Sequence, residues 1–415
     1  MADKIIISNK DEVHVVLTCD EGVAYELREH FTFFVPGYQF TPQYKARLWD
    51  GKIRLFDTRT RQMYRGLVPE IVKFCEARDY QWEYDNEVYD EEFSLNEANE
   101  FIKKLKPKHE PRDYQIEAFT HAIRTRRSLL LSPTASGKSL IIYLLVNYLI
   151  SKGLKKCLII VPTISLVEQL TSDFKDYSET NGMPINDLVH RIYQGQEKES
   201  SKPIIISTWQ SLYTLPKKYF EQFDFVIGDE AHQFKAKSLA EIMTGLINAK
   251  YRIGTTGTLD GTKTHRLVLE GLFGPVRKVI TTKELMDSKH LAEFNIKCLL
   301  LKHNDSICQA SKNFTYHQEI EYLILNESRN KFISNLALSL EGNTLILYQF
   351  VDKHGKILQD IITKRLDGNR KCFFVSGDTE VSIREDIRRI VETETNAIIV
   401  ASFGTFSTGI NIKNL

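Results

Sequence analysis

The 415-residue sequence carries almost no net charge, no closely spaced cysteine pair and no long apolar run. A formal charge of +1 gives no global positive field, so any binding to nucleic acid must depend on local basic patches. The six cysteines include no Cys-x-x-Cys pair, which argues against a zinc ribbon or disulfide framework and predicts reduced thiols in a cytoplasmic protein. The N-terminus lacks a secretory signal, and the apolar run near residues 140–150 is too short to span a bilayer, so we expect no membrane insertion.

Length and composition predict a globular protein of about three domains. Residues 1 to about 85 mix short alternating segments with Gly/Pro turns, which is typical of a small α+β unit. Residues 79–100 contain many carboxylates and no Lys or Arg, and residues 103–108 are basic, which indicates a linker or simply a solvated helix face. We therefore expect an accessory domain with its linker over residues 1–108.

Apolar runs and helix-length amphipathic segments alternate regularly after Pro111. The first series of strand-like runs covers residues 129–131, 158–161, 204–207 and 225–227, and the second covers residues 344–350, 372–375 and 398–401. Such alternation predicts parallel sheets with crossover helices. The expected fold class is α/β, with one parallel-sheet domain over residues 109–285 and a second over residues 286–415.

The strongest local signal is the segment Ser132-Pro-Thr134-Ala135-Ser136-Gly137-Lys138-Ser139, between a predicted strand and a predicted helix. This is the context of a Walker A phosphate loop, although Ser132 replaces the usual first glycine. Backbone N–H groups of the loop would wrap the phosphates of ATP, Lys138 would add positive charge, and the Ser139 hydroxyl would bind Mg²⁺. The alternative is a chance Gly-Lys-Ser in a turn.

The string Asp229-Glu230-Ala-His232 follows an apolar run, where a Walker B acid belongs. Asp229 would hold Mg²⁺ directly or through water, and Glu230 would orient and deprotonate the attacking water. Alone, the string could be a solvated loop. The phosphate loop upstream favours a catalytic set of Lys138, Asp229, Glu230 and His232.

Gln115 lies upstream of the phosphate loop and is preceded by Arg112-Asp-Tyr. Its amide offers both a donor and an acceptor, so it can match N6 and N7 of adenine. An isolated glutamine is usually a surface residue. The prediction that Arg112 and Gln115 contact the nucleotide therefore depends on their position.

Taken in order, seven segments resemble the motif series of superfamily 2 helicases: Arg112–Gln115, Pro133–Ser139, Val161–Leu166, Ser207–Ser211, Asp229–His232, Thr255–Thr258 and Ser407–Asn411. Their order and spacing are more specific than any single motif. The resemblance implies two tandem RecA-like domains that drive a helicase or translocase with ATP. Gly37–Pro42 and Leu48–Leu55 look like the accessory domain of the UvsW branched-DNA helicases of T-even-type phages.

The UvsW resemblance implies unwinding or branch migration of junctions, D-loops, R-loops and stalled forks in phage recombination, repair and replication. It implies branched or single-stranded DNA as the partner, with RNA–DNA hybrids and single-strand-binding or other recombination proteins as further candidates. We expect a monomer in the host cytoplasm. The motor motifs alone do not choose between DNA unwinding, double-strand translocation and RNA unwinding.

The same resemblance implies a nucleic-acid track that contacts backbone phosphates without reading sequence. Its candidate residues are Pro162, Thr163, Thr208, Trp209, Gln210, Phe350, Ser376 and Thr408. Thr256–Thr258 would connect this track to the nucleotide. Each Ser or Thr could instead be a cap or turn residue.

Residues 38–65 interleave aromatic and basic side chains, with Arg47, Lys52 and Arg54 as the candidates for binding phosphates. Exposed aromatic rings suit unpaired bases at a junction. Tyr38 and Trp49 could instead belong to the core of this small domain.

The last motif contains Gly409, a further candidate nucleotide contact, and the sequence stops at Leu415. In the family, a Gln-x-x-Gly-Arg-x-x-Arg segment with the arginine finger follows later. We therefore expect an incomplete second domain that binds ATP but hydrolyses it slowly. This expectation leaves open a non-catalytic module that only binds nucleic acid.

Overall fold

The computed structural model describes residues 4–84, 92–193, 195–235, 237–291, 295–366, 368 and 370–406. The chain forms two compact units, Met1–Glu293 and Phe294–Leu415, each described by itself below. None of the described helices combines the length and apolarity that a membrane span requires.

A five-stranded mixed sheet forms the N-terminal part of the first unit, in the order β5-β6-β2-β1-β7. Alternate residues of its two central strands are buried, including Ile5, Ile7, Val15 and Leu17, because a period of two places them on one face. Two helices pack on this face. The elements are β1 (Lys4–Asn9), β2 (His14–Thr18), α1 (Glu21–His30), β5 (Phe56–Asp57), β6 (Gln62–Tyr64), α3 (Val68–Glu76) and β7 (Gln81–Tyr84).

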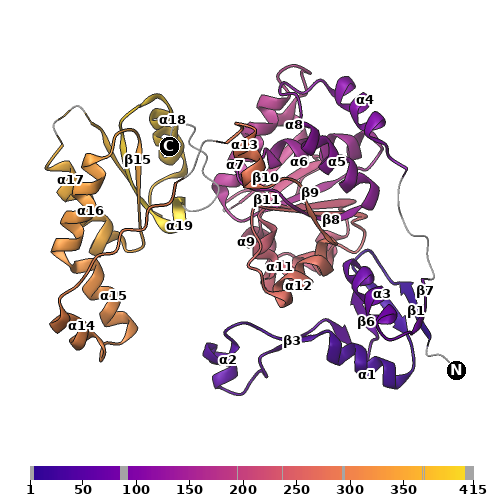
Figure 1. The fold of residues 1–415 in the computed structure, drawn as a ribbon. Helices are drawn as coiled ribbons and strands as arrows, with labels where there is room; N and C mark the ends of the chain where they lie inside the picture. The colour runs from indigo at the N-terminus through magenta and orange to yellow at the C-terminus, as the bar shows by residue number, and fades with distance from the viewer. Residues whose placement is uncertain are drawn as a thin grey trace. The chain divides into compact units, whose positions relative to one another are not determined.

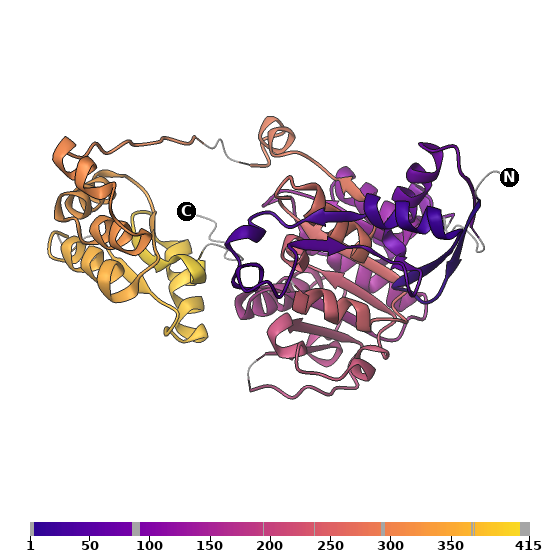
Figure 2. The ribbon, with the colours of Figure 1, turned by 90° about the horizontal axis from the view of Figure 1, so that it is seen from below.

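An extension, residues 32–54, leaves this accessory domain between α1 and β5. In it, β3 (Thr32–Phe34) pairs antiparallel with β4 (Lys52–Arg54), and the 3-10 helix η1 (Tyr38–Phe40) and the short helix α2 (Pro42–Lys45) form the tip. Figures 1 and 2 show it as an indigo arm that runs away from the five-stranded sheet.

A seven-stranded parallel sheet forms the rest of the first unit, in the order β10-β11-β9-β12-β13-β8-β14. All residues of β9, β11 and β13 are buried, as expected for strands covered on both faces. The carboxyl ends of parallel strands meet at one edge, where ligands bind in open α/β sheets. The strands are β8 (Arg127–Leu131), β9 (Cys157–Val161), β10 (Val189–Ile192), β11 (Ile204–Thr208), β12 (Phe225–Gly228), β13 (Tyr251–Thr256) and β14 (Val276–Lys278).

Helices cover both faces of this sheet (Figure 1). One face packs against α5 (Asp113–Thr125), α6 (Lys138–Ser151) and α7 (Ile164–Tyr177). The opposite face packs against α9 (Trp209–Leu212), α11 (Lys237–Gly245) and α12 (Lys263–Phe273). The connections also contain α8 (Ile185–Leu188), α10 (Lys217–Phe220), η3 (Ala231–Lys235) and α13 (Thr282–Asp287).

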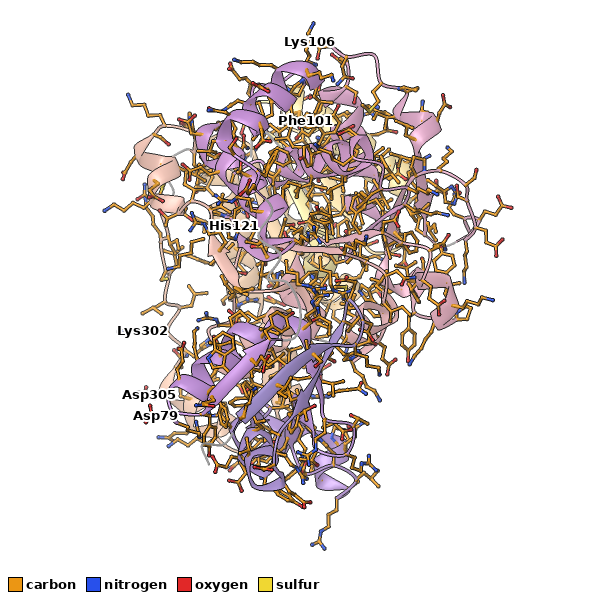
Figure 3. The ribbon with its side chains drawn as sticks, turned by 90° about the vertical axis from the view of Figure 1, so that its right-hand side faces the viewer. Asp79, Phe101, Lys106, His121, Lys302 and Asp305 are labelled. Carbon is orange, nitrogen blue, oxygen red and sulfur yellow. The ribbon has the colours of Figure 1, made fainter. Side chains whose placement is uncertain are left out.

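The acidic stretch predicted as a linker contains two regular elements. Its first residues form β7, and its last residues begin α4 (Leu95–Leu105) with a capping box. Ala98 and Ile102 of α4 are buried against α5 and α6, which share their core. In Figure 3, Phe101 lies on this helix and Lys106 directly follows its last residue. The carboxylates Glu97 and Glu100 are exposed on its outer side, as the alternative of a solvated helix face predicts.

The accessory domain and the seven-stranded domain share one continuous hydrophobic core. The 3-10 helix η2 (Arg65–Leu67) lies so close to α12 that a Cβ atom at Gly66 would be 2.1 Å from the carbonyl oxygen of Glu270. The Thr264 hydroxyl of α12 also donates to the carbonyl oxygen of Phe34, at 3.3 Å. The two domains are therefore packed as one body.

A charged cluster lies within this joint. The Glu12 carboxylate accepts hydrogen bonds from Arg65 at 2.8 Å and from Arg127 at 2.7 Å, and the same Arg127 nitrogen donates to the Glu12 carbonyl oxygen at 2.6 Å. Burial lowers the pKa of Arg127 to about 10. Since Arg127 opens β8, the cluster connects the accessory domain to the strand before the phosphate loop.

The second unit contains a three-stranded parallel sheet, in the order β15-β17-β16, with a small apolar core on each face. Its elements are α14 (Asp305–Ser311), α15 (Tyr316–Leu325), α16 (Glu327–Ser339), β15 (Thr344–Tyr348), the π-helix η4 (Val351–Gly355), α17 (Lys356–Thr363), β16 (Cys372–Val375), α18 (Val381–Thr393), β17 (Ile398–Ser402) and α19 (Phe403–Phe406). The predicted fold class is confirmed: an α+β region precedes two parallel-sheet α/β domains.

Candidate functional site

The phosphate loop connects the carboxyl end of β8 to the amino end of α6. Ala135 and Gly137 have positive φ angles of 64° and 75°, which turn the chain sharply around the start of the helix. Thr134 and Ala135 are exposed, whereas Ser136 is buried. The loop thus directs backbone N–H groups and the positive end of the α6 dipole toward one point, the arrangement that binds phosphate.

Hydrogen bonds from serine side chains within the loop stabilise its conformation. Ser132 donates to the Ser136 hydroxyl at 2.6 Å, and Ser136 donates to the carbonyl oxygen of Pro133 at 2.6 Å. The Ser132 backbone N–H donates to the carbonyl oxygen of Thr256 at 2.8 Å. The serine that replaces the first glycine is therefore a structural part of the loop.

Gln115 lies under the loop, and its amide is fully engaged within the protein. Its Nε2 donates to the carbonyl oxygen of Ser136 at 2.8 Å, and its Oε1 accepts from the backbone N–H of Arg112 at 2.9 Å. A Cβ atom at Gly137 would lie 2.3 Å from Nε2, and the φ angle of 75° is one that other residues rarely adopt, so both features favour glycine there. The adenine contact predicted for Gln115 would have to replace these bonds. Arg112 lies beside it and donates to the Tyr114 hydroxyl at 2.8 Å.

The acid pair follows β12, two strands away from the phosphate loop in the sheet. Asp229 accepts hydrogen bonds from the Thr255 hydroxyl at 2.7 Å and from the backbone N–H of Glu230 at 2.9 Å. Desolvation by burial raises the pKa of Asp229, although the Thr255 hydrogen bond and the Lys138 charge act in the opposite direction. Since Lys138 acts on this carboxylate, the fold brings the two predicted motifs together.

Glu230 adopts a left-handed conformation with φ of 49°. Its carboxylate lies 3.3 Å from Nδ1 of His232, which is also 3.0 Å from the Thr256 hydroxyl. Burial works against ionisation, but the His232 hydrogen bond and the Lys138 charge leave the pKa of Glu230 lowered. Glu230 is therefore ionised at neutral pH.

Thr255 and Thr256 connect these parts, because both end β13, the strand between β12 and β8. Thr255 bonds to Asp229, and the carbonyl oxygen of Thr256 accepts from the phosphate loop at Ser132. Thr256, the first residue of the segment predicted to connect the nucleotide with the nucleic-acid track, also contacts His232 and therefore touches both nucleotide motifs.

Ser139 has a partner that the motifs did not indicate. Its hydroxyl lies 2.7 Å from the hydroxyl of Tyr177, at the end of α7. The hydroxyl of Ser139 and the carboxylate of Asp229 are hard oxygen donors, the type that Mg²⁺ prefers. Two such donors suit a magnesium ion that also binds phosphate oxygens, so this donor set fits the metal.

Two predicted nucleic-acid loops lie side by side in the first unit, after the neighbouring strands β9 and β11. Thr163 caps α7 by accepting from the backbone N–H of Leu166 at 3.3 Å, and Thr208 pairs with the Ser211 hydroxyl at 3.0 Å. Gln210 donates to the carbonyl oxygen of Pro162 at 3.4 Å, which joins the two loops. Trp209 is partly buried against the core.

In the second unit, the predicted positions follow the ends of the strands. Phe350 follows β15 and is 38% exposed, and Ser376 follows β16 and is buried. The backbone N–H of Ser376 donates to the Thr379 hydroxyl at 3.0 Å. Thr408 and Gly409 lie outside the described residues.

The extension carries the remaining predicted residues. Arg54 pairs with Asp50, whereas the Lys52 ammonium lies 4.8 Å above the ring of Phe34. Arg47 is exposed, with φ of 55°, and lines an open pocket with Tyr44, Leu48 and Trp49. Tyr38 stacks on Phe34 in a local cluster. Phe40 and Leu48 are 78% and 81% exposed, so apolar side chains remain at the tip.

Comparisons with known proteins agree with this arrangement. A family model described as "DNA helicase UvsW, N-terminal" matches residues 4–85, and one described as "Type III restriction enzyme, res subunit" matches residues 108–261. The chain is 34% identical over 414 residues to "ATP-dependent DNA helicase uvsW" of Enterobacteria phage T4, which covers 98% of this chain and 82% of that protein. A DNA 3'-5' translocase of Sulfurisphaera tokodaii is 26% identical over 238 residues, 57% of this chain and 48% of that protein.

The solved structures give the same result. The crystal structure of T4 UvsW aligns with 99% of this chain and 82% of its own, with a TM-score of 0.62 and 33% sequence identity.

Proposed function

Because this chain belongs to the UvsW family of ATP-dependent DNA helicases, we propose that it unwinds or branch-migrates branched DNA such as junctions, D-loops, R-loops and stalled forks. The observation that carries the substrate class is the UvsW-type accessory domain packed into one body with the seven-stranded domain. Its extension combines basic and exposed aromatic side chains, which suit a junction where duplex and unpaired bases meet. The proposed setting is phage recombination, repair and replication in the host cytoplasm.

In this proposal the phosphate loop holds the triphosphate of ATP. Backbone N–H groups at the start of α6 bind the phosphates, and Lys138 neutralises charge that develops on them. Ser139 and Asp229 would hold Mg²⁺, which supplies further positive charge at the phosphates when bound. Arg112 and Gln115 are the proposed contacts for the base, and for Gln115 this contact requires an exchange of its hydrogen bonds to Ser136 and Arg112.

Glu230 is the proposed base for the attacking water. Its carboxylate is ionised and is held by His232, so it can orient a water molecule and accept its proton. Thr255 and Thr256 hold this acid pair in a fixed position relative to the phosphate loop. Such preorganisation accounts for most of the barrier reduction in phosphoryl transfer.

The proposed nucleic-acid track in the first unit consists of the loops after β9 and β11. Their backbone N–H groups and the hydroxyls of Thr163 and Thr208 suit phosphate oxygens. Phe350, Ser376 and Thr408 are the proposed counterparts in the second unit. Contacts of this type position a strand and leave sequence unread, as a helicase requires.

The test is a steady-state ATPase assay with forked DNA, linear duplex of equal length and single-stranded RNA. We expect forked DNA to give the largest stimulation. The Lys138→Ala variant should lose at least about a hundredfold in turnover on every substrate, because one charged contact to the transition state is removed. It should still bind forked DNA.

Stronger stimulation by RNA or by linear duplex would contradict the proposal and support an RNA helicase or a double-strand translocase. Equal remodelling of forked DNA by Lys138→Ala and the unmodified protein would show that binding alone accounts for the activity.

A further inference from the structure

Tyr177 is the last residue of α7 and belongs to none of the helicase motifs. Its hydroxyl lies 2.7 Å from the hydroxyl of Ser139, although 38 residues separate them in the sequence. A serine hydroxyl has one proton to donate and two lone pairs. If the proton points to Tyr177, the lone pairs remain available for a metal ion.

The surroundings of Tyr177 fix the position of its ring. The ring packs edge-to-face against Tyr143 with centroids 5.5 Å apart, and against His109 with centroids 5.8 Å apart. The carbonyl oxygen of Tyr177 accepts from the backbone N–H of Lys108 at 3.0 Å. The neighbouring Asp176 is 2.6 Å from both Lys108 and His109. The hydroxyl beside Ser139 is therefore held by packing on two sides and by ion pairs.

The Tyr177 hydroxyl is also a neutral partner. The pKa of a tyrosine hydroxyl is ordinarily about 10, so this group keeps its proton at neutral pH. A neutral oxygen can accept a hydrogen bond from the serine without bringing a third negative charge to a site that already contains Asp229 and Glu230.

We propose that Tyr177 is a positioning residue for the metal site: its hydroxyl oxygen accepts a hydrogen bond from the Ser139 hydroxyl and thereby directs the serine lone pairs toward Mg²⁺. This inference rests on the proposed role of Ser139 as a magnesium ligand. Groups that orient metal ligands in this way contribute about 10–100-fold to metal affinity in other proteins.

The Tyr177→Phe variant tests the proposal, because it removes the hydroxyl and keeps the ring. We expect the Mg²⁺ concentration for half-maximal binding of N-methylanthraniloyl-ATP to rise about tenfold. Binding of the same nucleotide in EDTA should be unchanged, since the phosphate loop is intact. The Mg²⁺ dependence of ATP hydrolysis should shift by the same factor.

Tyr143→Phe is the matched control. Tyr143 touches the Tyr177 ring, but its hydroxyl pairs with Ser178 at 2.9 Å and not with Ser139, so its Mg²⁺ dependence should stay unchanged. Melting temperatures of both variants show whether they are folded. A folded Tyr177→Phe variant with an unchanged or lowered Mg²⁺ requirement would overturn the proposal.

Ser139→Ala separates the two levels of inference. If Ser139→Ala raises the Mg²⁺ requirement and Tyr177→Phe does not, only the positioning role of Tyr177 fails. If Ser139→Ala itself leaves the Mg²⁺ dependence unchanged, the proposed metal ligand is wrong and the role of Tyr177 fails with it.

Discussion

The adjacent carboxylates Asp229 and Glu230 have pKa shifts of opposite sign. Desolvation raises the pKa of Asp229, so the ionised form that binds a metal costs folding free energy. For Glu230 the hydrogen bond from His232 and the Lys138 charge outweigh burial and lower the pKa. Its ionised form therefore stabilises the fold.

We predict that Asp229→Asn raises the melting temperature at pH 7 without Mg²⁺, although it abolishes ATP hydrolysis. A carboxyl whose folded pKa is raised contributes stability below its unfolded pKa, and this contribution is lost as the pH rises through the folded pKa. At pH 7 the charge is a cost that asparagine removes, while its Oδ1 still accepts from Thr255. A gain of about 1 kcal/mol would raise the melting temperature by about 2–4 °C.

Glu230→Gln is the control, and it should lower the melting temperature at pH 7. A lowered folded pKa contributes stability above the unfolded pKa, and this contribution is lost as the pH falls through the folded pKa. The melting temperatures of both variants should approach that of the unmodified protein as the pH approaches 4. A lower melting temperature for Asp229→Asn at pH 7 would contradict this account.

Single residues show where sequence reasoning ends. The motif order predicted that Lys138 and the acid pair would be close, and the fold brings them together. Spacing gave no sign of the Tyr177 hydroxyl beside Ser139, because a contact across 38 residues depends on how α7 packs. It also could not show that the Gln115 amide is engaged by the backbone at both ends.

Among the elements, the extension is the part of the accessory domain whose apolar side chains are most exposed. Its aromatic rings pack on each other, and its basic side chains differ in their partners. Arg54 is paired with Asp50, whereas Arg47 makes no ion pair with any described residue. Arg47 and Lys52 can therefore bind phosphate without first breaking an ion pair.

We predict that replacing Arg47, Lys52 and Arg54 together by Ala weakens binding to forked DNA in a salt-dependent way. The logarithm of the binding constant falls with the logarithm of the salt concentration, and each phosphate contact contributes about 0.7–0.9 to the steepness of this fall. Loss of three contacts should therefore make the slope shallower by about 2 or more. Fluorescence anisotropy over a range of salt concentrations measures this. Unchanged affinity at low salt would exclude the extension from DNA binding.

A second triple variant, Lys4, Lys10 and Lys73 to Ala, controls for net charge. These lysines are exposed on the accessory domain outside the extension, so the variant loses the same charge. Its salt slope should match that of the unmodified protein.

Most elements of the sheets follow from local pattern. The apolar run predicted at 372–375 is β16, and those at 129–131 and 158–161 lie within β8 and β9. The alternation of strand and helix was enough to predict two parallel-sheet domains. The prediction of a linker over residues 79–100 was partly wrong, because the end of this stretch begins helix α4. The capping box and the apolar positions of α4 lie among acidic residues, which obscure the helical period of the sequence.

At the scale of the whole molecule, the joint between the accessory domain and the seven-stranded domain depends on Glu12. This carboxylate offsets the charges of Arg65 and Arg127, which are almost completely removed from water. The sequence separation of 115 residues between Glu12 and Arg127 hid this contact from any local reading.

We predict that Glu12→Gln destabilises the first unit by about 3 kcal/mol, because two arginines lose their buried counter-charge. All three tryptophans, Trp49, Trp82 and Trp209, lie in this unit, so tryptophan fluorescence in urea reports its unfolding. Glu83→Gln is the control, since the exposed Lys4–Glu83 pair should contribute at most about 1 kcal/mol. An equal loss of unfolding free energy in both variants would show that the buried cluster stabilises the unit no more than an exposed ion pair does.

Helix α7 begins directly after its N-cap residue Thr163, in a loop proposed to hold the DNA backbone, and ends at Tyr177, next to Ser139. Its 14 residues form a rod of about 21 Å with no proline or glycine to absorb bending. If the DNA strand moves the first turn of α7 by a fraction of an ångström, the last turn of this helix should move by almost the same distance. ATP hydrolysis and DNA binding would then be linked mechanically within the first unit.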